Sequence, residues 1–121
     1  MSWWVSICDV KGKYFQVERF SDGGTLVLGG SSEASLNITY NYAKHYYRAF
    51  DELPEGLRSL DGMDVIEALP HLAKACKTLP DSPEDDYWKG SEGNAGHALH
   101  ILKQWCKQAI RSEVKLVFSV D

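Results

Sequence analysis

The sequence predicts an α+β domain: an antiparallel sheet of about five strands with helices packed mainly on one face. Two observations support this class. Segments near both ends alternate apolar and polar residues, as strands do, whereas residues 64–78 and 94–111 repeat apolar residues at helical spacing. The element order ββββ-α-α-α-β places the helices together over the sheet. At 121 residues, the chain is expected to form one domain, residues 1–121, with a single core.

Four strands are expected before the first helix. Residues 3–8 and 13–20 alternate, and the short glycine-containing connection between them predicts a hairpin. Residues 25–30, "TLVLGG", are expected to form a third short strand. The fourth strand is expected at residues 35–42, with Leu36, Ile38, Tyr40 and Tyr42 on one face.

The stretch "ITYNYAKHYYRAF", residues 38–50, contains four of the six tyrosines. Asn41 suits a helix N-cap. The apolar residues that follow have the i, i+3, i+4, i+7 spacing of a short buried helix: Ala43, Tyr46, Tyr47 and Phe50. We therefore expect the tyrosines to be mainly core, with hydroxyls reaching polar partners, and not a stacking platform for a ligand.

Two longer helices and one strand are expected in the second half. A helix over residues 64–78 begins with Asp64 in a capping-box pattern, although Pro70 predicts a kink or a restart. Residues 94–111 have the strongest helical periodicity in the chain. A final strand is expected from the alternation of Val114, Leu116, Phe118 and Val120.

Composition excludes several classes of protein. The formal charge of −4 argues against a nucleic-acid binder and favours a basic protein partner. The three cysteines form no CxxC pair, and Cys76 and Cys106 fall on apolar helix faces, which predicts buried, inert thiols. No stretch approaches the length of a membrane span and no signal-like N-terminus is present, so a cytoplasmic location is expected.

The exposed segment with the clearest potential for binding is an acidic loop, residues 81–92. Carboxylates could steer a basic partner and aromatic side chains could anchor it. The alternative is a solvated loop whose tryptophan folds back onto the core. The candidate partner-binding residues are Asp81, Glu84, Asp85, Asp86, Tyr87 and Trp88.

The glycine run "GSEGNAG" gives a second candidate site. Its spacing matches neither a dinucleotide fingerprint nor a P-loop, but it opens a helix whose free N–H groups could bind an anion at Gly93, Asn94 and Gly96. The alternative is structural: the glycines allow a close approach of helix to sheet, and Asn94 or Ser91 caps the helix.

Two further candidates are weaker. His97 and His100 have the i, i+3 spacing that can present two imidazoles to one metal, but they are expected on a solvated helix face without an obvious third ligand. The polar strand face Asn37, Thr39 and Asn41 could line a small pocket. No catalytic residue and no cofactor is predicted.

Two stretches, "LNITYNYAKHYYRAF" and "DDYWKGSEGNAGHALHILKQW", resemble a group of small proteins found in bacteria and their phages. The likeness extends over about two-thirds of the chain, including "LDGMDVIEALPHL". The group has no assigned activity, so the resemblance implies only an accessory protein linked to a phage or prophage.

The sequence thus predicts a non-enzymatic, protein-binding accessory or inhibitor-like module with the acidic loop at its contact surface. The alternative is a small-ligand or anion-binding domain that uses the helix start near Gly93 and Gly96. A weaker alternative is a metal-dependent enzyme built on His97 and His100. The sequence leaves the oligomeric state open.

Overall fold

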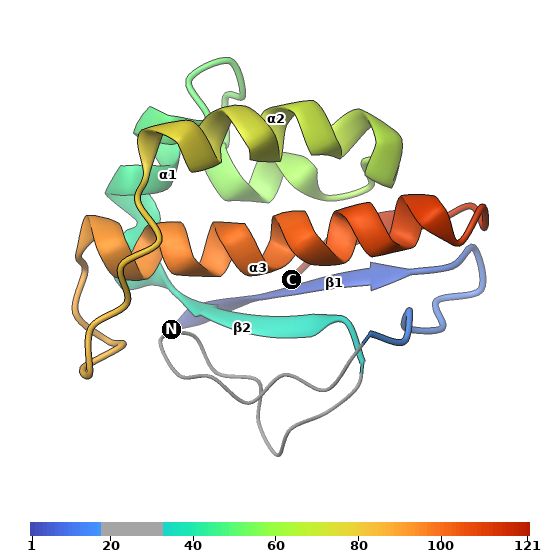
Figure 1. The fold of residues 1–121 in the computed structure, drawn as a ribbon, viewed down its shortest axis with the longest axis horizontal. Helices are drawn as coiled ribbons and strands as arrows, with labels where there is room; N and C mark the ends of the chain where they lie inside the picture. Colours follow the sequence, from blue (N-terminus) through green and yellow to red (C-terminus); the bar gives the residue numbers. More distant parts are fainter. Residues whose placement is uncertain (18–32) are drawn as a thin grey trace.

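The computed structural model of the protein describes residues 1–17 and 33–121. These residues contain one antiparallel sheet of three strands in the order β2-β1-β3 (Figure 1). The strands are β1 (Ser2–Cys8), β2 (Ser35–Thr39) and β3 (Val117–Val120). The α+β class is therefore confirmed.

The helices lie on one side of the sheet. In Figure 1, α3 runs along the sheet and α2 lies on the far side of α3. The α-helices are α1 (Ala43–Ala49), α2 (Val65–Thr78) and α3 (Glu92–Arg111), and the 3₁₀ helices are η2 (Tyr40–Tyr42) and η3 (Gly56–Leu60).

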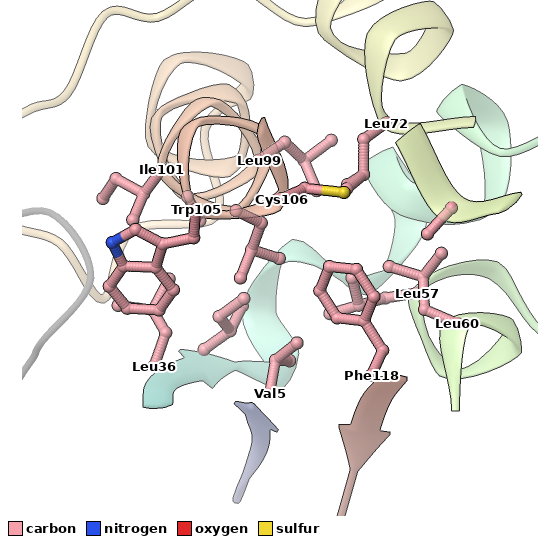
Figure 2. Close-up of a cluster of buried hydrophobic side chains, with 14 of the residues drawn as sticks. Val5, Leu36, Leu57, Leu60, Leu72, Leu99, Ile101, Trp105, Cys106 and Phe118 are labelled. Atoms are coloured by element: carbon pink, nitrogen blue, oxygen red, sulfur yellow. The ribbon is translucent and has the colours of Figure 1, made fainter. Parts of the chain in front are cut away.

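The core fills the space between the sheet, α3 and η3. Figure 2 shows Phe118 of β3 beside Leu57 and Leu60 of η3, while Trp105 of α3 lies above Leu36 of β2. All of these side chains are buried. Full burial of one such side chain stabilises the fold by about 1.5–3 kcal/mol, so this single cluster holds the elements together.

The prediction of about five strands is not matched within the described residues, which form three. The predicted partner of β1 covers residues 13–20, and its described part, residues 13–17, makes isolated bridges at Tyr14 and Gln16. The reason is that β1 is the central strand: β2 pairs with Ser2–Ser6 and β3 with Val5–Cys8. The predicted strand at 25–30 lies outside the described residues.

The predicted strand at 35–42 ends early, at Thr39. The Thr39 hydroxyl accepts a hydrogen bond from the Asn41 N–H (3.2 Å) and starts η2, so Thr39, and not Asn41, is the cap. The helical turn moves Tyr40 to the surface and leaves Tyr42 buried. Tyr47 is also exposed, which corrects the predicted apolar stripe of α1.

The two long helices agree more closely with their predictions. Asp64 caps α2 by accepting from the Ile66 N–H (2.8 Å), and α2 continues through Pro70 without restarting. Ile66 and Pro70 both lie on the exposed side of α2, so the carbonyl that lacks its helical donor can bind water. Helix α3 begins two residues earlier than predicted. Within the described ranges, no helix is long and apolar enough to cross a membrane.

Candidate protein-binding loop

The backbone of the acidic loop is held by one buried amide side chain. Asn94, in the first turn of α3, is fully buried. Its Oδ1 accepts from the Glu84 N–H at 2.7 Å, and its Nδ2 donates to the carbonyls of Asp86 and Lys89 at 3.0 Å each. Because the three bonds reach residues 84, 86 and 89, Asn94 fixes the turn of the loop around itself.

A second set of contacts reaches the loop from η2 and α1. The Asn41 Nδ2 donates to the Trp88 carbonyl at 2.6 Å, and the Tyr42 hydroxyl donates to the Tyr87 carbonyl. The Nε2 of buried His45 lies 2.8 Å from the Gly90 carbonyl. A carbonyl only accepts, so this Nε2 carries the proton. Three carbonyl groups of the loop backbone, at residues 87, 88 and 90, are thus bonded to side chains from residues 41–45.

Two glycines allow α3 to approach the start of the loop. A Cβ on Gly93 would lie 2.0 Å from the Ser82 carbonyl oxygen, and one on Gly96 would lie 2.0 Å from that of Pro80. Only glycine fits at such separations. The predicted close approach therefore exists, but helix α3 makes it with the segment that follows α2 and not with the sheet.

The outer surface of the loop presents aromatic rings and carboxylates. Trp88 is 47% exposed, and its ring packs against that of Tyr87 with centroids 5.0 Å apart. The Asp86 carboxylate accepts from the Trp88 N–H at 3.1 Å, which fixes the turn that carries the indole. Asp85 is exposed and, among the described residues, makes no hydrogen bond or ion pair.

Ion pairs hold the rim of the loop. Lys89 Nζ lies 3.0 Å from Glu84 Oε1, and Arg48 of α1 lies 2.7 Å from Glu92. A hydrogen bond from Ser91, and then the bond from Lys89, lower the pKa of the Glu84 carboxyl. The carboxylates of Asp85 and Asp86 consequently have no cation of this chain beside them within the part that the structure describes.

The candidate anion site is occupied by the protein's own groups. Ser91 caps α3 by accepting from the Asn94 N–H at 3.2 Å. The Asn94 side chain binds the loop, and carbonyl oxygens of residues 80 and 82 face Gly96 and Gly93. Since carbonyl oxygens repel an anion, the geometry gives these residues a structural role.

The two candidate metal ligands, His97 and His100, bind different groups of the protein. The Nδ1 of His97 lies 2.7 Å from Asp81 Oδ1, and the Nδ1 of His100 lies 2.7 Å from the Gly96 carbonyl. The His97 side chain is only 12% exposed and His100 is partly buried, so this face of α3 is not solvated as expected. No group of three or more metal-ligating side chains occurs in the described ranges.

The polar face predicted at residues 37–41 is divided between three environments. Asn37 donates to Ser2 Oγ at 2.7 Å, Thr39 caps η2, and Asn41 reaches the acidic loop. They do not share one pocket, because the strand ends at Thr39.

The three cysteines are buried, as predicted for Cys76 and Cys106. Burial raises the pKa of the Cys76 thiol to about 11 and that of Cys106 to about 12. The Cys106 thiol also donates to the Val65 carbonyl at 3.1 Å. Both groups are therefore protonated at neutral pH and poor nucleophiles.

The residues that hold the acidic loop were not predicted from the sequence in that role. Asn41, Tyr42 and His45 lie more than forty residues before the backbone they bind. A signal was nevertheless present: His45 is a polar residue beside Tyr46 on a buried helix, and a buried polar group needs a partner. Asn94 gives the same signal on the apolar face of α3.

Comparison with known protein families, with characterised proteins and with solved structures finds no match to this chain.

Proposed function

We propose that the protein is a non-enzymatic binding module whose acidic loop docks a basic protein partner. One observation carries the proposal: the buried side chains of His45 and Asn94 bond the loop backbone on two sides, while Trp88 remains half exposed in the turn that Asp86 caps. A large aromatic residue held at the surface of an ordered loop loses little conformational entropy when it binds.

The charges of the loop favour a basic partner. Asp85 and Asp86 shortly precede Trp88 in the loop, and Lys89, which follows Trp88, is already paired with Glu84. A lysine or arginine of a partner could contact a carboxylate and the face of Trp88 together. Acidic inhibitors of basic toxins or nucleases belong to this class, as would a phage- or prophage-linked accessory protein.

The test is affinity capture with tagged protein in lysate of the native host, with and without expression of its phage or prophage genes. We expect one stoichiometric partner for the unaltered protein. The double variant Asp85→Lys/Asp86→Lys should lose most of the capture, because it reverses the steering charge beside the anchor. Capture should also weaken as salt is raised.

The matched control is Glu55→Lys/Glu67→Lys, which changes net charge equally at two exposed carboxylates away from the loop. It should capture the partner as well as the unaltered protein does. Equal capture by both double variants would exclude the acidic loop as the contact surface, and equal loss in both would show that only net charge matters.

A further inference from the structure

A hollow lies on the face of the sheet that points away from α3. Trp3, Val5 and Ile7 point into the core, so the alternate residues of β1 face the other side. The hollow has a volume of 380 Å³, within the usual range for a small-ligand site. It is lined by Trp4, Ser6, Tyr14, Ser35 and Asp121.

Two aromatic side chains, Trp4 and Tyr14, and two serine hydroxyl groups line the hollow. The backbone of Tyr14 forms an isolated antiparallel β-bridge with that of Cys8. Trp4 is 43% exposed and Tyr14 is 42% exposed. Ser6 lies between them and pairs with Ser35 of β2, with the two hydroxyl oxygens 3.0 Å apart. Strand positions 4 and 8 are roughly 13 Å apart, so the small serines leave a gap between the rings.

One wall of the hollow is negatively charged. The backbones of Trp4 and Asp121 exchange two hydrogen bonds of 2.9 Å, which places their side chains together on one face. Among the described residues that line the hollow, Asp121 is the one that carries a charge. Burial, and then the charges of Asp9, Asp121 and Asp61, raise the pKa of the neighbouring Cys8 thiol, which indicates a negative potential here.

We propose that this hollow binds an organic ammonium ion, the protonated end of an alkylamine. Indole and phenol rings attract cations over their faces, with indole the strongest of the side chains. The Asp121 carboxylate and a serine hydroxyl can accept the N–H groups. A free amine and the lysine side chain of a peptide share this chemistry. The proposal is independent of the acidic loop, which uses none of these residues.

The test is a titration of the full chain followed by NMR, with n-butylammonium as the probe and 1-butanol as its neutral analogue. We expect saturable shifts of the Trp4 indole N–H and the Ser6 amide with the cation and far smaller shifts with the alcohol. Titration with an N-acetyl-lysine amide asks whether a peptide lysine also enters. Binding of this probe would identify a lysine side chain as a ligand, and its failure beside bound n-butylammonium would identify a free amine.

Two variants locate the site. Asp121→Asn keeps the shape and should weaken n-butylammonium binding about three- to fivefold, the range of an exposed ion pair. Trp4→Leu should weaken it about fivefold or more. Glu67→Gln and Tyr47→Leu remove an exposed carboxylate and an exposed ring elsewhere and should change nothing. Equal shifts with 1-butanol, no saturation, or unchanged affinity in Asp121→Asn would overturn the proposal.

Discussion

At the scale of single residues, Asn94 has the greatest influence on the acidic loop. Its side chain is a donor to two carbonyls and an acceptor for one N–H, which is nearly its full capacity. An aspartate of the same shape could accept but could not donate. The residue type is therefore determined by the loop backbone and not by the helix that carries it.

We predict that Asn94→Ala lowers the free energy of unfolding by about 2–3 kcal/mol, because it leaves partly buried backbone groups without partners. The Asn94→Asp variant should be no more stable than Asn94→Ala, since its carboxylate would face the carbonyls of Asp86 and Lys89. Urea denaturation measures both values, and hydrogen exchange should show faster exchange of the amides at 84–89. An aspartate variant as stable as the unaltered protein would contradict this role.

The buried thiols predict a dependence of stability on alkaline pH. The pKa of Cys106 is about 12 in the folded protein against an ordinary value of 9.0. Between these values the unfolded chain loses the proton and the folded chain keeps it, so the free energy of unfolding falls as pH rises. Below pH 9 the contribution is complete.

The measurement is urea denaturation under reducing conditions from about pH 8, where both states keep the proton, to about pH 10.5, where the unfolded chain has lost it. Cys106→Ala should be less stable at every pH, since it removes buried volume, but its stability should fall less steeply. Parallel pH profiles for the two proteins would show that Cys106 does not titrate on unfolding.

At the scale of elements, the contact of α3 with the segment after α2 depends on two glycines. Gly96→Ala would gain about 1 kcal/mol in helix propensity. We nevertheless predict a net loss of about 2–3 kcal/mol, because the new Cβ would lie 2.0 Å from the Pro80 carbonyl oxygen. Gln104→Ala, on an exposed position of the same helix, should change the unfolding free energy little. Thermal unfolding of the two variants compares them, and a stabilised Gly96→Ala would disprove the close contact.

Local sequence patterns predicted the elements whose structure depends on local forces. The long apolar repeat of α3 and the Asp64 cap of α2 are both present in the structure. The strand at 35–42 was extended too far because a side-chain cap at Thr39 competes with strand pairing. The number of strands depends on which segments flank β1, and these come from distant parts of the chain.

In the acidic loop, too, local features could be predicted from the sequence and contacts with distant segments could not. The acidic residues and Trp88 could be selected from the sequence because charge and aromatic content are local properties. The contacts that order the loop could not, since Asn41 and the backbone of Trp88 are 47 residues apart. Asn94 was named as an anion ligand, and its actual partners became visible only once the loop was placed around it.

At the scale of the whole molecule, the tyrosine-rich segment, residues 38–50, makes polar contacts with both the acidic loop and α3. Tyr42 and Tyr46 pack in the core, and their hydroxyls bond to the carbonyls of Tyr87 and Ala95. The segment thus joins the core to the acidic loop. The stability of the core and the order of the proposed contact surface are therefore coupled.

The most direct test of the account is a hydrogen-exchange footprint of the protein in complex with its captured partner. We predict protection of the amides of residues 84–90, in excess of the protection they have in the free protein, and of the Trp88 indole N–H. The amides of α2 that face away from the loop serve as the internal reference. Protection confined to another surface, or capture of no stoichiometric partner, would contradict the assignment of the acidic loop as the contact surface.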